Sequence, residues 1–283
     1  MRDWPALLVR FPAGCPAEWP DLVSAALDGL DVVAIDEPSG DTWRVCFRSP
    51  EARAAAAAAL DGLAGAGLDI RQTEMPDEDW ARRSQAALGA IRVGRIVVAP
   101  PWDPAASAAP DGVITVVIEP GMGFGSGHHA TTRLCLRALL EHPPTARSVL
   151  DIGTGSGVLA IAAAKLGAAS VLAVEVDADA LESARTNAGF NGHPPALSFM
   201  EADFRSEPLP PADIVLANLT GGMLAASAGA VMGVCKPGGV VILSGITTEE
   251  ARGVAEAFQR HARIQTREDE DGWVSLVVSP AAA

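Results

Sequence analysis

A glycine-rich segment follows an apolar run near the middle of the chain. Residues 149–157 read Val-Leu-Asp-Ile-Gly-Thr-Gly-Ser-Gly, so the run ends with Gly153, Gly155 and Gly157. Glycine lets the backbone approach a ligand without the obstruction of a Cβ atom. A helix predicted over 157–166 would direct its N-terminal amide groups at an anion such as a carboxylate. The segment therefore predicts a ligand-binding turn between a strand and a helix, although such glycines also occur in turns that bind nothing.

An acidic residue completes the pattern. Glu175 closes a second apolar run, 170–174, and stands twenty-four positions after Asp151. A carboxylate at the tip of a parallel strand can accept hydrogen bonds from both hydroxyls of a ribose. The spacing Gly-x-Gly-x-Gly, preceded by Asp151, differs from the Gly-x-Gly-x-x-Gly of dinucleotide sites. It favours a single nucleoside with an amino-acid tail, and we therefore predict that the chain binds S-adenosylmethionine.

The surrounding sequence alternates apolar runs with helical segments, which indicates an α/β fold with a parallel sheet covered on both faces. The predicted elements after the glycine turn span 170–175, 178–190, 197–201, 213–217, 221–235, 240–244 and 248–261. Ligands of such sheets bind at the carboxyl ends of the strands, where Glu175, Asp203 and Asn218 fall. The last runs, 263–268 and 273–278, are joined by a polar segment and predict an antiparallel hairpin.

The first 74 residues predict a separate α+β domain. Its elements follow the order βαββαβ, which is typical of a ferredoxin-like fold with a four-stranded antiparallel sheet. They span 6–11, 17–30, 32–36, 42–48, 50–66 and 68–74. Residues 75–93 are expected to form a linker with a helix over 77–88, and residues 94–283 the α/β domain. Two further strands, 95–99 and 113–119, are expected to form a hairpin around a Pro/Ala-rich loop, with Trp102 either lining a pocket or simply packed.

A second glycine-rich segment lies upstream, between Glu119 and Thr132. Its four glycines within seven residues predict a loop that wraps a ligand. Phe124 could cover an apolar face of that ligand, and Thr131 or Thr132 could donate a hydroxyl hydrogen bond. The pair His128-His129 invites a metal site, but adjacent residues rarely bind one ion and no partner cluster stands at ligand spacing. We predict no metal; a catalytic base or a helix cap at these histidines both stay open.

Composition limits the classes of partner. The chain has 283 residues, a formal net charge of −14 and no apolar run of membrane-spanning length. Such a charge disfavours nucleic acid as a direct substrate and favours a basic protein. The four cysteines never form Cys-x-x-Cys, so buried, reduced thiols are expected. From these features we expect a monomeric cytoplasmic protein that does not bind membranes.

Together these motifs resemble the PrmA family, the bacterial methyltransferases of ribosomal protein L11. The resemblance extends over nearly the whole chain and is most specific in the loop Pro-Gly-Met-Gly-Phe-Gly-Ser-Gly-His-His-Ala-Thr-Thr. It also rests on residues 149–168, on Ala217-Asn-Leu-Thr220, and on Lys236-Pro-Gly-Gly followed by Leu-Ser-Gly-Ile246. It implies a class I, Rossmann-like fold and methyl transfer from S-adenosylmethionine to lysine side chains or α-amino groups of L11.

The resemblance also assigns cofactor contacts, which would fall on Thr132, Gly153, Glu175 and Asn218. The residue patterns add Asp151, Gly155, Phe124 and Asp203 as further cofactor-binding candidates. By the same resemblance, residues 1–74 would recognise the substrate protein. The chain departs from the family pattern where it has Glu175 in place of Asp, Gly123-Phe-Gly-Ser-Gly127 in place of Ala-Phe-Gly-Thr-Gly, and Asn218-Leu-Thr-Gly221 in place of Asn-Ile-Leu-Ala.

The expected chemistry needs a neutral amine, because a sulfonium methyl group is displaced by a lone pair. Desolvation lowers the pKa of an amine, so acceptors that aim the lone pair can suffice without a strong base. The Asn218 side chain and the backbone carbonyl of Leu219 are the candidates, although Asn218 could merely end a strand. The alternative functions are a methyltransferase for another protein or for a small-molecule amine, and a non-catalytic S-adenosylmethionine-binding regulator. The additional N-terminal domain argues against a small-molecule acceptor.

Overall fold

The computed structural model divides the chain into two compact units, Met1–Leu88 and Gly89–Ala283. It describes residues 3–12, 14–16, 19–27, 30–39, 41–65, 67–76, 89–108, 111–120 and 129–280. The predicted linker helix over 77–88 and the glycine-rich loop at 121–128, with Phe124, lie outside the described residues.

The smaller unit has the predicted ferredoxin-like fold. Its elements are β1 (Asp3–Arg10), α1 (Trp19–Leu27), β2 (Val32–Ser39), β3 (Thr42–Phe47), α2 (Pro50–Ala59), α3 (Asp61–Gly65) and β4 (Asp69–Pro76). The sheet order is β2-β3-β1-β4 with every pair antiparallel. Alternate residues of β1 bury Leu7 and Val9 against Phe47 and against Leu60, which follows α2. The single helix predicted over 50–66 is two helices, since α2 ends before Leu60 and α3 begins after it.

The larger unit contains a seven-stranded sheet in the order β10-β9-β8-β11-β12-β14-β13. The strands are β8 (Ser148–Ile152), β9 (Ser170–Glu175), β10 (Leu197–Glu201), β11 (Ala212–Asn218), β12 (Cys235–Thr247), β13 (Ala262–Glu270) and β14 (Trp273–Pro280). The five from β8 to β12 are parallel, whereas β14 is antiparallel to both β12 and β13. The predicted parallel sheet and its terminal hairpin are confirmed.

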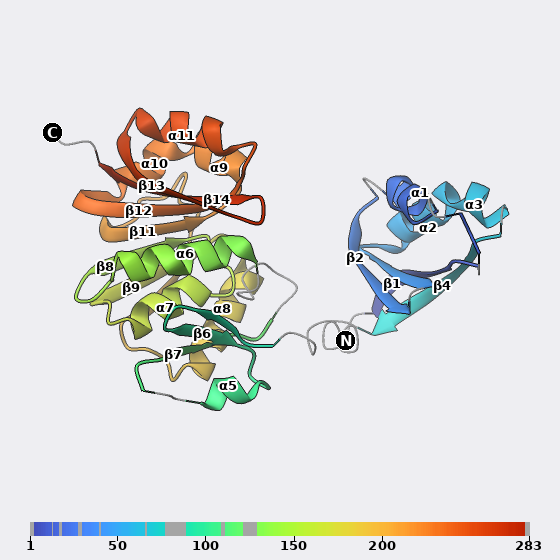
Figure 1. The fold of residues 1–283 in the computed structure, drawn as a ribbon, viewed down its shortest axis with the longest axis horizontal. Coiled ribbons are helices and arrows are strands. Elements are labelled where there is room, and N and C mark those ends of the chain that lie inside the picture. The colour runs from blue at the N-terminus through green and yellow to red at the C-terminus, as the bar shows by residue number, and fades with distance from the viewer. Residues whose placement is uncertain are drawn as a thin grey trace. The chain divides into compact units, whose positions relative to one another are not determined.

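Helices cover both faces of this sheet, as Figure 1 shows. One face carries α6 (Ala130–Glu141), α7 (Val158–Lys165) and α8 (Ala178–Phe190), and the other carries α9 (Gly221–Ala226), α10 (Ala228–Gly233) and α11 (Ala251–Gln259). The parallel strands are therefore buried on both sides and read as continuous apolar runs rather than alternating ones. From β8 the chain continues to β9 and β10, which lie on one side of β8 in the sheet, and then crosses to β11 on the other side. The strand order therefore reverses between β8 and β11. Ligands of parallel sheets bind at such a reversal.

A second, three-stranded sheet corrects the sequence analysis. It consists of β5 (Ile91–Val93), β6 (Ile96–Ala99) and β7 (Ile114–Val117). The expected hairpin between the last two strands is wrong, because β6 and β7 are parallel. Their connection contains α5 (Pro104–Ser107) and is long enough for the crossover that parallel strands need. Trp102, in this connection, is 47% exposed and is not a core residue.

Two expectations from composition can be compared with the described residues. Cys46, Cys135 and Cys235 are buried, as expected, Cys15 is half-buried, and these four described cysteines form no disulfide. In the described part of the chain, none of the helices is long and apolar enough to cross a membrane.

Candidate functional site

The glycine turn after β8 has the backbone conformation that its sequence predicts. Gly153, Gly155 and Gly157 have φ angles of +69°, +52° and +82°, in the region that side chains other than glycine rarely adopt. The amides of Gly153 and Thr154 donate to the carbonyl oxygen of Val174, at 2.9 and 3.0 Å. The turn is therefore joined to the end of β9, and Gly157 is the N-cap residue of α7.

Asp151 lies beneath this turn, with 1% of its surface exposed. Its Oδ2 accepts hydrogen bonds from the Thr154 hydroxyl at 2.7 Å and from the Ala160 amide at 3.1 Å. Burial raises the pKa of Asp151 to about 6, although both hydrogen bonds act in the opposite direction and the charge of Glu175 acts with the burial. The carboxyl group thus joins Thr154 of the turn to the first part of α7 and stabilises the turn from below.

Glu175 ends β9 beside the same turn. Its Oε2 accepts from the Gly155 amide at 3.0 Å, and its Oε1 accepts from the Val176 amide at 2.8 Å. The side chain is half-buried, so the carboxylate is held by backbone groups while part of it still faces solvent. The predicted pairing of the glycine turn with a strand-tip carboxylate is therefore present as a direct hydrogen bond.

Asp203 follows β10, at the neighbouring strand end. The amide of Ala202 donates to the Glu175 carbonyl at 3.0 Å, which brings the two strand ends together. Both carboxylate oxygens of Asp203 pair with the Arg205 guanidinium, at 2.8 and 2.7 Å. The Arg205 side chain and then its amide lower the pKa of Asp203 to about 2. Asp203 is thus a fixed carboxylate on the edge of the site.

Asn218 and Leu219 form a corner where β11 ends. The amide of Leu219 donates to the Ser244 carbonyl at 3.0 Å. A Cβ atom at Gly153 would lie 2.4 Å from Leu219 Cδ2, and one at Gly245 would lie 2.2 Å from the Leu219 carbonyl oxygen. The corner is therefore packed between two glycines, one in the glycine turn after β8 and one in β12. Because the sequence predicts that Asn218 and Leu219 orient an amine, we refer to residues 218–222 as the amine corner.

The N-terminus of α6 lies at the same end of the sheet. His129 is its N-cap residue, and its Nδ1 lies 2.8 Å from the Thr131 hydroxyl. The imidazole also packs edge-on against Trp273 of the terminal hairpin, with ring centroids 4.6 Å apart. Thr131 is thus already engaged by His129, and the neighbouring Thr132 is buried in the first turn of the helix. His129 therefore occupies the N-cap position, but its side chain makes no capping hydrogen bond to a helix amide and pairs with the Thr131 hydroxyl instead.

Metal binding is not supported by the described residues. Among them, no three His, Cys, Asp or Glu side chains come together in a way that could hold an ion. His128, the other half of the histidine pair, lies outside the residues that the structure describes.

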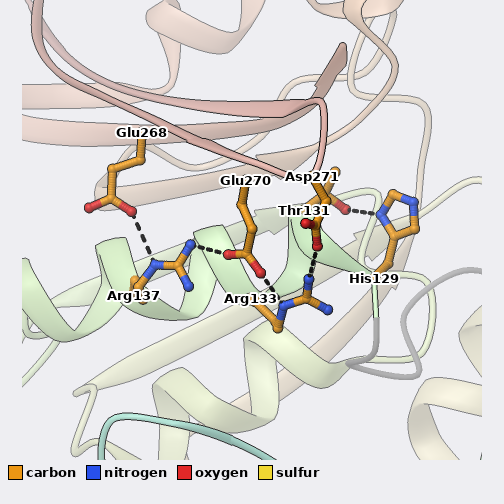
Figure 2. Close-up of polar contacts among 7 residues, drawn as sticks. All are labelled: His129, Thr131, Arg133, Arg137, Glu268, Glu270 and Asp271. Carbon is orange, nitrogen blue, oxygen red and sulfur yellow. Dashed lines mark hydrogen bonds and ion pairs between the residues drawn. The ribbon is translucent and has the colours of Figure 1, made fainter. Parts of the chain in front are cut away.

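Ion pairs fasten α6 to the terminal hairpin, as Figure 2 shows. Arg133 contacts Glu270 at 2.5 Å and Asp271 at 2.8 Å. Arg137 contacts Glu268 at 3.1 Å and also pairs with Glu270. Burial alone would raise the pKa of Glu270, but the two guanidinium groups hold it below its ordinary value. The hairpin therefore fixes the helix that directly follows the glycine-rich loop.

Two asparagines that the sequence analysis did not select hold the other end of that loop. Asn187 of α8 is fully buried; its Oδ1 accepts from the Glu119 amide at 2.8 Å, and its Nδ2 donates to the Ser156 carbonyl at 2.9 Å. Asn191 accepts from the Val117 amide at 2.9 Å. The glycine turn and the segment before the loop are thus joined by one amide. The only sequence signal is the four-residue spacing of the asparagines, which puts them on one helix face.

Comparison with known proteins identifies relatives of this chain. The family model described as "Ribosomal protein L11 methyltransferase (PrmA)" matches residues 46–280. The ribosomal protein L11 methyltransferase of Pelotomaculum thermopropionicum is 38% identical over 275 residues, 96% of this chain and 87% of that protein. The protein of the same name from Pseudomonas paraeruginosa is 38% identical over 206 residues, 72% of this chain and 68% of that protein. A crystal structure of ribosomal protein L11 methylase from Lactobacillus delbrueckii subsp. bulgaricus has a TM-score of 0.62 and 26% identity, covering 69% of this chain and 99% of that chain.

Substitution of Gly245 by alanine tests the packing of the amine corner. Gly245→Ala should lose about 1–3 kcal/mol of unfolding free energy beyond the cost of its positive φ, because the new Cβ would overlap the Leu219 carbonyl. Gly238→Ala is the matched control, since Gly238 also has a positive φ but nothing within 4 Å of its Cβ position. Denaturant titration of both variants measures the difference. Equal losses in the two would contradict the packing described.

The buried Asp151 predicts a pH dependence of stability. Its pKa is raised in the folded chain, so the stability it contributes is present below its unfolded pKa of 3.8 and is lost as the pH rises through about 6. Asp151→Asn does not titrate. From about pH 4 to about pH 7 the wild type should therefore lose roughly 2 kcal/mol of unfolding free energy relative to this variant. Denaturation of both at several pH values measures the difference, and a constant difference would disprove the raised pKa.

Proposed function

The chain belongs to the ribosomal protein L11 methyltransferase family, and from that premise we propose that it transfers methyl groups from S-adenosylmethionine to lysine side chains or α-amino groups of L11. The observation that carries the proposal is the contact between two parts of one site. The glycine turn, with Glu175 bonded to it, lies directly against the amine corner through Gly153 and Leu219. A methyl donor bound at the glycine turn and an amine bound at the amine corner would therefore be neighbours.

The residues of the turn fit the shape and charge of S-adenosylmethionine. Its glycines leave the backbone open, and Glu175 offers partly exposed carboxylate oxygens to a ribose. The N-terminus of α7 favours a carboxylate. Other groups that we assign to cofactor binding are Thr132, Gly153, Gly155, Asn218, Asp203 and Phe124, with Asp151 supporting the turn from below. When bound, S-adenosylmethionine supplies a methyl group on an electrophilic sulfonium centre.

The amine corner would prepare the acceptor. A lysine ammonium has to lose its proton before the nitrogen can attack, and desolvation lowers the pKa of an amine. The amide oxygen of Asn218 and the carbonyl oxygen of Leu219 would then accept hydrogen bonds from the amine and direct its lone pair. The packing of Leu219 between Gly153 and Gly245 fixes the direction of that carbonyl. Orientation of this kind can replace a strong general base.

Charge and domain organisation favour a protein acceptor. The net charge of −14 repels phosphate-rich partners and attracts a basic protein. The smaller unit is unnecessary for a small-molecule methyltransferase, and we assign the recognition of L11 to residues 1–74, which residues 75–93 link to the catalytic domain. We further propose that the enzyme acts as a monomer in the cytoplasm, where its substrate is made.

The activity can be tested with radiolabelled cofactor. Incubation of the chain with labelled S-adenosylmethionine and total protein from cells lacking the endogenous enzyme should label one band, identified by mass spectrometry as L11. A chain without residues 1–74 should label that band at least tenfold less, because the recognition unit is gone. Label on a metabolite or on RNA would overturn the protein substrate. Labelling that survives the deletion would overturn the role of residues 1–74.

Substitution of Asn218 tests the amine corner. Asn218→Ala should lower kcat roughly 100-fold, because the oriented acceptor of the amine is lost, and should change the KM for L11 much less. Glu249→Ala is the control, since Glu249 is an exposed polar residue outside the amine corner. Steady-state kinetics of both variants on purified L11 provide the comparison. A fully active Asn218→Ala enzyme would show that this side chain only ends a strand.

A further inference from the structure

Glu250 lies between β12 and α11, and its side chain reaches back toward the amine corner. Its Oε2 accepts from the Thr247 amide at 3.0 Å and from the Thr247 hydroxyl at 2.9 Å. These two bonds, the amide first, hold the pKa of Glu250 below its ordinary value, and the amide of Gly222 contributes as well. The carboxylate is therefore fixed in one position although the residue is exposed.

That position is the space that a side chain at Gly221 would fill. A Cβ atom at Gly221 would lie 2.7 Å from Glu250 Cδ, 2.7 Å from its Oε2 and 2.9 Å from its Oε1. Real Cβ atoms do not approach other atoms so closely, so a larger residue at 221 would displace the Glu250 carboxylate from this position. Gly221 itself is buried and is the first residue of α9. The Glu250 carboxylate consequently packs against the backbone of Gly221, where the amine corner overlaps the start of α9.

We propose that Glu250 is a positioning residue that sets the amine corner, through its contact with Gly221 and Gly222. The inference rests on the proposed function, because it assigns the corner to the acceptor amine. Glu250 would not touch the reacting atoms; it would hold the backbone that carries Asn218 and the Leu219 carbonyl.

The geometry explains why such a residue is needed. The helix α9 has only six residues, too few to fix its own start, and a carboxylate near a helix N-terminus is favoured by the helix dipole. The contacts described above at Gly153, Gly245 and the Ser244 carbonyl are made by Leu219. Glu250 instead contacts Gly221 and Gly222, at the other end of the corner. A misplacement of about 1 Å in such a site can cost on the order of 100-fold in rate.

Kinetics of four variants on L11 test the proposal. Glu250→Ala should lower kcat roughly tenfold or more with the KM for L11 changed less than about threefold, since only orientation is lost. Glu250→Gln should retain clearly more activity than Glu250→Ala, because its side chain still fills the space beside Gly221 and its amide oxygen can accept both Thr247 bonds. Gly221→Ala should lower kcat like Glu250→Ala, because the methyl group displaces the carboxylate. When Glu250→Ala is already present, Gly221→Ala should lower kcat little further.

Glu249→Ala is the matched control, since Glu249 is the neighbouring exposed carboxylate and should be replaceable without loss. An increase in the KM for L11 with unchanged kcat, equally large in Glu250→Gln and Glu250→Ala, would instead make Glu250 a direct contact of the basic substrate. Unchanged kcat in Glu250→Ala, or additive effects of the two substitutions, would likewise overturn the proposal.

Hydrogen exchange separates failure of this inference from failure of the proposed function. The amide of Leu224 donates to the Thr220 carbonyl at 3.0 Å, across the start of α9. It should exchange faster in Glu250→Ala than in the wild type or in Glu249→Ala, whatever the substrate of the enzyme. Equal protection would show that Glu250 does not hold the corner, even if L11 is methylated as proposed.

Discussion

The site depends on the contact between Gly153 and Leu219. The absence of a side chain at Gly153 lets the Leu219 side chain cross over the turn that ends β8, and the Leu219 carbonyl in turn lies against Gly245. Gly153 directly follows β8, Leu219 directly follows β11 and Gly245 lies in β12, and the strand order reverses between the first two of these strands. One apolar contact thereby sets the distance between the half of the site proposed for the cofactor and the half proposed for the amine. A shift of either half would move the other.

The surrounding elements fix both ends of the glycine-rich loop. Asn187 joins the segment before the loop to the glycine turn, while the ion pairs of Arg133 with the terminal hairpin hold the helix after it. A ligand-wrapping loop gains precision when its ends are anchored to rigid elements rather than to other loops. The antiparallel hairpin is an addition to an otherwise parallel sheet. By holding α6 in place, it also fixes the position of the C-terminal end of the loop.

The sequence predicted those features that depend on local pattern. Continuous apolar runs identified the parallel strands, and the alternation of Gly with small residues identified the turn at 153–157. It could not predict that Glu250 packs on Gly221, or that Asn187 links two loops, because these contacts join residues that are distant in the chain. The error at β6 and β7 has the same origin. A connection with proline and alanine is compatible with a hairpin loop or with a crossover, and only the packing of the strands against α7 decides between them.

The polar groups of the site differ in what they contribute to stability. Asp151 and Asn187 are buried, so removal of either would leave backbone groups of the turn unpaired and would cost folding free energy. The carboxylates of the hairpin are exposed or partly exposed, and ion pairs of that kind contribute at most about 1 kcal/mol. Glu250 is exposed as well and is held by hydrogen bonds from Thr247. Their effect must therefore lie in geometry rather than in folding. The inner groups make the turn possible, whereas the outer ones determine where the amine corner and α6 lie relative to it, and substitutions among the outer groups can change rate while the fold persists.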